Sequence, residues 1–342
     1  MLFFDPSIAK ALSMYMTMLT NHLRAVKSWG EKQAAHASID VESFQMEVKA
    51  RNRYFTLHPQ FRARINGQLV NVGQLSDEST GFLGWLPYKQ MKWPLSTDKL
   101  LFKAFGADRG LRVPAWCFPP AQLGHDFILK RSMGSFGRDI EGPFRAGEAF
   151  AGFAEGRGVG FAEQFIRGTN LKLWIWGRTI FHAHVNPYPT VVGDGVQSIA
   201  QLIGQLAEAQ SPRMPRPAGD EEAVAAAVAY QGFARTNVLP ANVSVWLDFR
   251  YGRDYQSPAT TAVADNALHK LSEAVLAQAR HAADVLARDL EALYSAPVLY
   301  SLDGVLDDSG NAWWLEVNSN PSLPPTGYSH IFATLFGTQP DA

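Results

Sequence analysis

Residues 313–321 read Trp-Trp-Leu-Glu-Val-Asn-Ser-Asn-Pro, and this stretch decides the fold more than any other part of the chain. Polar residues stand at Glu316, Asn318 and Asn320, with apolar or small residues between them. Side chains two residues apart in a β-strand face the same way, so these three polar groups would share one face. The spacing predicts a half-buried strand over residues 312–317.

Asp303 supplies a second acidic group, directly after another strand predicted over residues 297–302. Pairing of the two strands would bring Asp303 beside Glu316 and Asn318 in a cluster of oxygen donors. Hard cations such as Mg²⁺ take such ligands together with phosphate oxygens and water. The same pattern also fits an exposed polar strand face that ends in a simple turn.

Two lysines lie upstream, at the boundaries of predicted elements. Lys99 opens a helix predicted over residues 99–110, and Lys130 ends an apolar strand predicted over residues 126–130. A lysine that leaves a buried strand needs a negative partner, because an isolated buried ammonium group is costly. A polyphosphate would supply that partner.

A Gly/Ser loop over residues 131–138 follows Lys130. Gly134 and Gly137 allow backbone N–H groups to close on phosphate oxygens, and Ser135 and Arg138 add side-chain donors. The loop is not a Walker A loop, since no Gly-Lys-Ser/Thr follows a first glycine at the required spacing. It fits a phosphate-covering loop or a plain hairpin.

The composition restricts the classes of function. The 342 residues include 31 Lys and Arg against 32 Asp and Glu, and this balance argues against a nucleic-acid partner. With 46% hydrophobic and 18% charged residues, the chain can bury a sizeable core. Cys117 is the single cysteine, which excludes an internal disulfide and a cysteine-built zinc site. These features fit a cytoplasmic protein, with Cys117 as a small buried hydrophobe.

The first residues do not form a convincing export signal, because no basic cluster precedes the apolar residues 1–4. Apolar residues then recur at helical spacing over residues 8–19, a length too short to span a bilayer. The pattern predicts an amphipathic helix on a core or on a partner subunit. We expect no membrane partner, and a homodimer is the assembly that this helix favours.

The chain divides into three predicted units of an α+β fold with mostly antiparallel sheets. They are an N-terminal domain at 1–95, a small lobe at 96–170 and a large lobe at 171–342, with an insertion at about 205–240. Asn66-Gly67 between two alternating runs predicts a hairpin. Helices are also expected over residues 146–155, 221–231 and 264–293.

Taken together, these segments resemble the ATP-grasp family of carboxylate–amine ligases, in its cyanophycin synthetase and glutathione synthetase-like branch. Each segment is a weak signal alone, but all of them occur in family order between about residues 96 and 322, whereas residues 1–95 match no family hallmark. The matching segments are Asp98-Lys99 with Gly110-Leu-Arg-Val-Pro114, the Lys130 strand with its loop, Glu163-Gln-Phe-Ile166-Arg-Gly168, Val192-Gly193-Asp194-Gly195 and Leu315–Pro321.

The resemblance implies an ATP-grasp fold, in which two α+β lobes grip ATP behind a separate N-terminal domain. It also implies ATP and two Mg²⁺ ions as cofactors, with Mn²⁺ as a substitute. The implied metal ligands are Asp303, Glu316 and Asn318. The residues implied to hold ATP are Lys99, Lys130, Gly134, Ser135, Gly137, Arg138, Glu163, Gln164, Ile166, Asn170 and Lys172.

Within that set, the resemblance places the Glu163 side chain near the adenine amine and the backbone of residues 164–166 along the adenine edge. Asn170 departs from the acidic ribose contact that is common in the family. Arg250 and Arg253 follow a strand predicted over residues 242–249 and would hold the substrate carboxylate, with Asn320 as a further catalytic residue. A surface arginine pair fits the same sequence.

The implied activity is an ATP-dependent ligase that forms an amide or peptide bond through an acyl phosphate and releases ADP and phosphate. Small amino-acid-like or peptide substrates would be its partners. Two alternatives stay open: an ATP-grasp phosphotransferase that acts on a hydroxyl, and an ATP-binding module without turnover.

Two same-face pairs in a predicted hairpin carry less weight. His182 and His184 could bind a metal, but no third ligand is evident, so packing or solvent contact is favoured. Trp174 and Trp176 are expected in the core rather than as a base-stacking platform.

Overall fold

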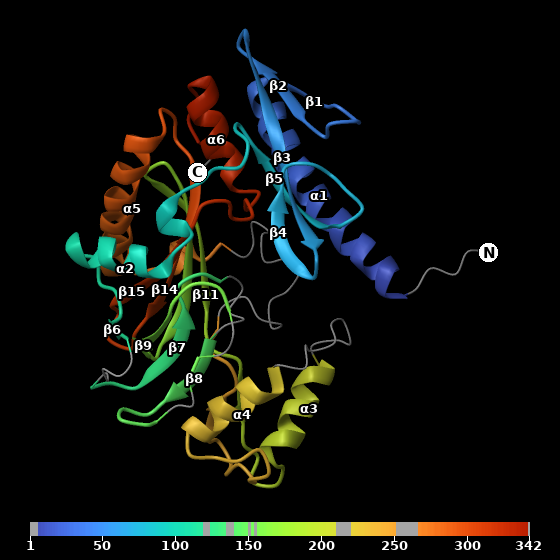
Figure 1. Ribbon diagram of the computed structural model, residues 1–342. Coiled ribbons are helices and arrows are strands. Elements are labelled where there is room, and N and C mark those ends of the chain that lie inside the picture. The colour runs from blue at the N-terminus through green and yellow to red at the C-terminus, as the bar shows by residue number, and fades with distance from the viewer. Residues whose placement is uncertain are drawn as a thin grey trace.

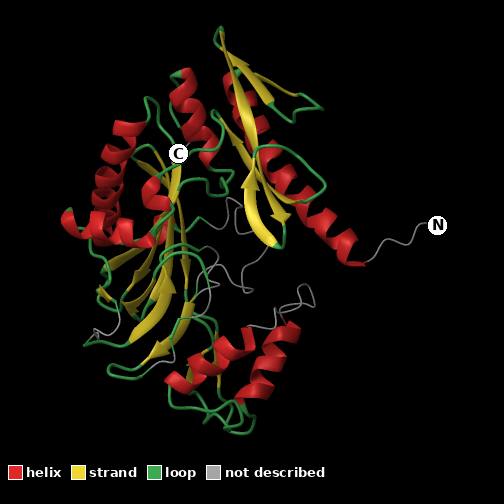
Figure 2. Cartoon of the chain, viewed as in Figure 1, coloured by secondary structure: helices red, strands yellow, loops and turns green. Residues whose placement is uncertain are grey.

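The fold is α+β, as the sequence predicts (Figures 1 and 2). The computed structural model describes residues 6–118, 124–134, 140–149, 152–153, 156–209, 220–250 and 266–340. Every strand pair in these residues is antiparallel, and the strands form four sheets. In this part of the chain, none of the helices is both long and apolar enough to cross a membrane.

The N-terminal part is a five-stranded sheet packed on one long helix (Figure 1). Its strand order is β1-β2-β3-β4, with β5 also paired to β3. Asn66 and Gly67 close the β3–β4 hairpin with φ of 50° and 76°, so the predicted hairpin is confirmed. The elements are α1 (Pro6–Gln33), β1 (His36–Ile39), β2 (Met46–Ala50), β3 (Arg53–Ile65), β4 (Gln68–Val72) and β5 (Ser79–Leu86).

A smaller sheet follows, with strand order β6-β9-β7-β8. Helix α2 begins at Lys99 because the Asp98 side chain caps it, accepting from the backbone N–H groups of Leu100 and Leu101. The elements are η1 (Pro94–Ser96), α2 (Lys99–Asp108), β6 (Trp116–Cys117), β7 (Phe127–Arg131), β8 (Ile140–Phe144) and β9 (Gly160–Gln164).

The helix predicted over residues 146–155 is wrong. The described residues there form a turn and irregular chain. Gly147 and Gly152 have φ of 76° and 129°, which an α-helix does not allow.

The larger sheet has strand order β11-β10-β14-β15 and carries the charged site on one face. Its other face packs on α5 through Leu173, Tyr300 and Val317. The helix predicted from residue 264 starts only at Glu273, because the Ser272 side chain accepts from Val275 N–H and caps it there. The elements are β10 (Thr169–Trp176), β11 (Thr179–Asn186), η3 (Leu268–Lys270), α5 (Glu273–Leu293), β14 (Leu299–Leu306), β15 (Ala312–Asn318) and α6 (Gly327–Phe336).

A helical excursion between β11 and α5 has its own apolar core, built around Val191, Ile203 and Val228. It overlaps the predicted insertion at 205–240, while the predicted limits of the three units stay a prediction. Its elements are β12 (Thr190–Val192), α3 (Ile199–Ala209), α4 (Asp220–Tyr230) and β13 (Ser244–Trp246).

Gly168 joins the two sheets at a point that leaves no room for a side chain. A Cβ atom there would lie 1.9 Å from the carbonyl oxygen of Leu306. We therefore expect Gly168→Ala to lower the free energy of unfolding by about 1–3 kcal/mol or more, because backbone must move. Gly204→Ala in α3 is the matched control: its Cβ meets nothing within 4 Å, so helix propensity should raise stability by about 0.5–1 kcal/mol. Urea denaturation measures both, and equal effects would contradict the packing argument.

Candidate active site

Four polar residues form one row across the larger sheet. The strand register pairs Lys172 with His184 on one side and with Asp303 on the other, and pairs Asp303 with Glu316. Asn318 lies on the same face as Glu316, and its amide Nδ2 donates to Asp303 Oδ2 at 2.7 Å. The predicted proximity of Asp303, Glu316 and Asn318 is therefore present, while their role as metal ligands remains a prediction.

Both carboxylates of this row form ion pairs with lysines. Lys172 Nζ lies 2.6 Å from Asp303 Oδ1 and 3.0 Å from Oδ2. Lys99 Nζ lies 3.1 Å from Glu316 Oε2 and donates to the carbonyl oxygen of Gly134 at 2.6 Å. Lys99 thus links α2 to the last strand of the larger sheet and to the start of the Gly/Ser loop.

A second charged group is fully buried between α2 and the smaller sheet. Lys130 Nζ lies 2.6 Å from Glu163 Oε1, and Lys103 pairs with the other oxygen, Oε2. The exposed fractions of Lys103, Glu163 and Lys130 are 0%, 1% and 5%. Lysines therefore contact both oxygens of Glu163, and the contact between Glu163 and adenine remains a prediction.

Lys103 is the site residue that the sequence analysis missed. Its signal is the spacing from Lys99, because residues four apart on a helix lie on the same face. α2 thus directs one lysine to the smaller sheet and another to the larger sheet.

The carboxylates of the site differ in how burial and neighbouring charge act on them. Burial raises the pKa of Glu163, but the charges of Lys103 and Lys130 outweigh it and hold that pKa below its usual value. Burial also raises the pKa of Glu316, but the charges of Lys99 and Lys130 outweigh this effect and hold that pKa below its usual value.

Asp303 has the opposite outcome. Burial raises its pKa, Lys172 opposes this, and the nearby charge of Glu316 adds to the rise. Among the three carboxylates, Asp303 is therefore the one whose ionised form a further cation would stabilise most. Lys130 acts on both Glu163 and Glu316, so four ammonium groups and three carboxylates form one continuous cluster. When all are ionised, this cluster has one excess positive charge.

The predicted adenine and ribose contacts already have protein partners. The backbone N–H of Gln164 donates to Ala115 O, and its side-chain oxygen accepts from Ala115 N–H at 3.3 Å. Ile166 O accepts from the Tyr188 hydroxyl. Asn170 Nδ2 donates to the carbonyl oxygen of Phe249 at 3.0 Å. These contacts hold the connection between the sheets.

The structure gives two predicted catalytic residues other partners. The Arg250 guanidinium forms two bonds to the Asp248 carboxylate, at 2.9 and 2.7 Å, and this buried pair neutralises its charge. The Asn320 amide donates to Met91 O and accepts from Met91 N–H, so it ties the loop after β15 to the N-terminal part. Four further predicted site residues, Ser135, Gly137, Arg138 and Arg253, lie outside the described residues.

The two histidines pack in the interior beside Trp174. His182 Nδ1 bonds to Thr326 Oγ1 at 3.0 Å, and both imidazole rings meet the Trp174 ring edge-on. Burial and then the neighbouring His184 lower the pKa of His182 to about 3, so it is neutral. Trp174 and Trp176 are buried, as expected of core residues.

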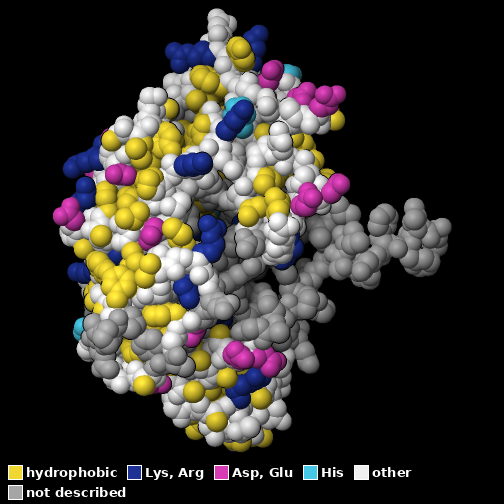
Figure 3. Space-filling model, viewed as in Figure 1, with side chains coloured by type: hydrophobic (Ala, Val, Ile, Leu, Met, Phe, Trp, Pro, Cys, Tyr) yellow, Lys and Arg dark blue, Asp and Glu magenta, His cyan; other side chains and the backbone are white. Residues whose placement is uncertain are grey.

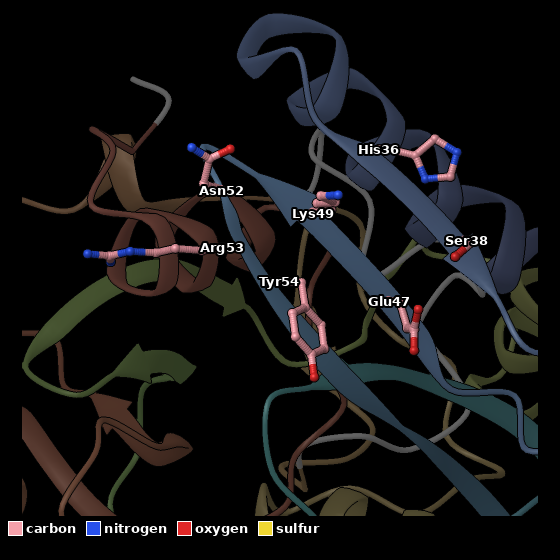
Figure 4. Close-up of a pocket in the computed structure, with 7 residues that line it drawn as sticks. All are labelled: His36, Ser38, Glu47, Lys49, Asn52, Arg53 and Tyr54. Carbon is pink, nitrogen blue, oxygen red and sulfur yellow. The ribbon is translucent and has the colours of Figure 1, made fainter.

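A hollow of about 250 Å³ lies elsewhere, on the outer face of β1, β2 and β3 (Figure 4). All of its lining side chains are exposed, and it belongs to the N-terminal sheet rather than to the charged cluster. The lining residues are His36, Ser38, Glu47, Lys49, Asn52, Arg53 and Tyr54. We therefore place the candidate site at the lysine–carboxylate cluster.

Glu163→Gln tests the buried group. The change leaves Lys103 and Lys130 facing each other without a counter-charge, and we expect the free energy of unfolding at pH 7 to fall by about 3–5 kcal/mol. Since the folded-state pKa of Glu163 is lowered, its contribution is present at neutral pH and is lost as the pH falls through that pKa. The difference from wild type should therefore shrink in acid.

Glu291→Gln is the matched control, because it breaks an exposed pair with Arg178 and should lower the free energy of unfolding far less than Glu163→Gln does. Guanidinium denaturation at pH 7 and at pH 4 measures both variants. Equal losses for the two variants at pH 7 would contradict the assignment.

No protein-family model matches the chain, and no curated protein matches its sequence. Among solved structures, the bifunctional glutathione synthetase from Pasteurella multocida is similar with 13% identity and a TM-score of 0.43, covering 92% of this chain and 43% of that one. D-alanine–D-alanine ligase from Bacillus anthracis follows with 12% identity and a TM-score of 0.33, covering 71% of this chain and 67% of that one.

N5-carboxyaminoimidazole ribonucleotide synthetase from Thermotoga maritima has 12% identity and a TM-score of 0.34, covering 72% of this chain and 51% of that one. The chain thus spans less than half the length of the glutathione synthetase. Because these TM-scores lie below 0.5, we infer the function from the geometry of the site and not from these neighbours.

Proposed function

We propose that the chain is an ATP-grasp ligase that uses ATP to join a carboxylate to an amine. The observation that supports this most is the continuous cluster of four lysines and three carboxylates between two antiparallel sheets. Lys99 is central, since it contacts both Glu316 and the first part of the Gly/Ser loop at Gly134. A structural ion-pair network alone would not require a glycine loop at its edge.

A bound triphosphate would replace the carboxylates as the partners of the lysines in this cluster. Its oxygens would attract Lys99, Lys130 and Lys172, whose ammonium groups lie along the cluster. Asp303 and Glu316 would then lose their lysine partners and need other cations. The exchange replaces each ion pair by another, so burying the phosphates would leave no unpaired charge.

The donor set suits magnesium ions. Two carboxylates on adjacent strands, Asp303 and Glu316, and the Asn318 amide offer hard oxygen ligands, and phosphate oxygens and water would complete the coordination. Asp303 has a raised pKa that a cation would lower. Among the described residues, no three His, Cys, Asp or Glu side chains converge on one point, so the ions would need the nucleotide. Bound there, they would neutralise phosphate charge.

The chemistry of the reaction follows from activation by ATP. A substrate carboxylate oxygen bonds to the γ-phosphorus, the bond to the bridging oxygen breaks, and ADP leaves. The amine nitrogen then bonds to the carbonyl carbon of the acyl phosphate, phosphate leaves with the bonding electrons, and an amide remains after proton loss. The lysines position the phosphates and stabilise their charge, which supplies most of the catalysis in phosphoryl transfer.

We also propose amino-acid-like or peptide substrates, a cytoplasmic location, and neither a nucleic-acid nor a membrane partner.

Hydroxylamine trapping tests the activity over a panel of amino acids and dipeptides. A ligase yields a hydroxamate and ADP with its carboxylate substrate. ADP with a stable phosphoester would indicate a phosphotransferase, and nucleotide binding without ADP release would indicate a binding module.

Lys130→Ala should weaken ATP binding by about 10- to 150-fold, because charge-assisted contacts contribute about 1.5–3 kcal/mol. The control is Lys270→Ala, which removes an exposed lysine outside the cluster and should leave affinity unchanged. Isothermal titration with a non-hydrolysable ATP analogue measures both, and a melting curve confirms that each variant is folded. Equal affinity of Lys130→Ala and wild type would contradict the phosphate assignment.

Glu316→Gln should abolish ADP release while the protein stays folded, because the amide removes one anionic oxygen from the metal site. Near-normal turnover across a magnesium titration would show that Glu316 is not a metal ligand. Glu273→Gln, at an exposed ion pair on α5, is the control and should turn over normally.

A further inference from the structure

One face of β3 presents polar side chains toward the loop that follows β15. Leu57 and Phe61 of this strand pack in the core shared with α1, so Gln60 and Arg62 point to the opposite face. Asn71 of β4 is the cross-strand partner of Arg62 and adds a third polar residue beside them.

Residues of this polar face and of β5 contact the loop over residues 319–323. Asn71 Nδ2 donates to Asn320 O at 2.7 Å, and Arg62 Nη2 lies 3.5 Å from Ser322 Oγ. Leu323 packs against Gly84, the residue paired with Gln60 on β5. The N-terminal sheet therefore meets the larger sheet immediately after the strand that carries Glu316.

Gln60 is the observation that points to a ligand. Its exposed fraction is 3%, yet neither Oε1 nor Nε2 has a hydrogen-bond partner in the described part of the chain. A buried amide without partners is costly, so a native protein rarely keeps one without a purpose. Two residues on, burial lowers the pKa of the Arg62 guanidinium, and a carboxylate placed beside it would offset that burial.

A series of contacts connects this face to the charged cluster. Ser322 O accepts from Trp174 Nε1 at 2.8 Å, and Lys172 Nζ lies 5.5 Å from the centre of the Trp174 ring. Lys172 in turn pairs with Asp303. The surface is hollowed between the N-terminal sheet and the rest of the chain, with Lys and Arg side chains beside the hollow (Figure 3).

We propose that Arg62 and Gln60 form a subsite for a substrate carboxylate that is not the one activated by ATP. This inference rests on the proposed ligase function and identifies one substrate as an amino acid that keeps its carboxylate during the reaction. The guanidinium fork suits a carboxylate. The Gln60 Nε2 group could donate to that carboxylate, and Oε1 could accept from the ammonium group of the same amino acid. Arg62 is connected to Lys172 and Asp303 only through Ser322 and Trp174, so a carboxylate held by Arg62 would lie outside the lysine–carboxylate cluster.

Binding without turnover tests the subsite. The probes are the twenty L-amino acids and glutarate, each compared with its carboxamide, titrated into the wild-type chain by calorimetry. The variants are Arg62→Ala, Gln60→Leu and, as the matched control, Arg64→Ala, which removes an exposed arginine from the same strand. A non-hydrolysable ATP analogue is titrated into every variant.

The expected result is that at least one acid binds and that Arg62→Ala weakens it tenfold or more. The matching carboxamide should bind the wild-type chain as weakly as the acid binds Arg62→Ala. Arg64→Ala should not change the affinity for the acid. Gln60→Leu should also weaken binding, and it decides the matter if Arg62→Ala does not fold. The inference is overturned if no acid in the panel binds, or if both site variants bind as wild type does. If no acid binds but the ATP analogue binds the wild-type chain, the proposed ligase function stands without this subsite. If the ATP analogue does not bind the wild-type chain, the proposed ligase function itself is refuted.

Discussion

The structure depends on one buried carboxylate held between two lysines. Glu163 is almost completely buried, and an ionised carboxylate in that position is stable only because Lys103 and Lys130 neutralise it from α2 and β7. This contact fixes α2 against the smaller sheet. Because Lys99 lies one turn earlier on the same helix, fixing α2 also delivers Lys99 to Glu316 on the larger sheet. The relative placement of the two sheets and the charge pattern of the site therefore have a common origin.

The larger sheet adds a constraint of register. Its alternation puts Lys172, Asp303 and Glu316 on one face and Leu173, Leu302 and Val317 on the face covered by α5. A slip of one residue in any strand would send a charged side chain into that apolar core. The same apolar face that stabilises the sheet thus enforces the row of charges. This also explains why the row is continuous from β10 to β14 and β15, although β10 lies more than a hundred residues earlier in the sequence.

Local patterns were sufficient for part of this structure. The alternation at Glu316 and Asn318, the lysine at the end of β7 and the Asn66-Gly67 turn each depend on neighbouring residues, and the sequence predicts them correctly. The pairs Arg250–Asp248 and Asn320–Met91 were not predicted, because a side chain's partner depends on which segments the whole fold brings together. Lys103 shows the intermediate case: its helical face is readable from the spacing to Lys99, but its partner on β9 is not. The helix expected at 146–155 failed because two glycines take backbone conformations that the apolar pattern does not reveal.

The loop after β15 connects these parts of the molecule. It begins directly after Asn318, which bonds to Asp303, and its next residues are held by Met91, Asn71 and Arg62 of the N-terminal part. Any movement of that part relative to the larger sheet would pull on the strand that carries Glu316. Conversely, an exchange of partners at Asp303 and Glu316 would be felt at Asn320 and Ser322. Residues 318–322 therefore connect the N-terminal part to the charged cluster, and a substrate held on β3 and a nucleotide held by the lysines would contact the two ends of the same five-residue segment.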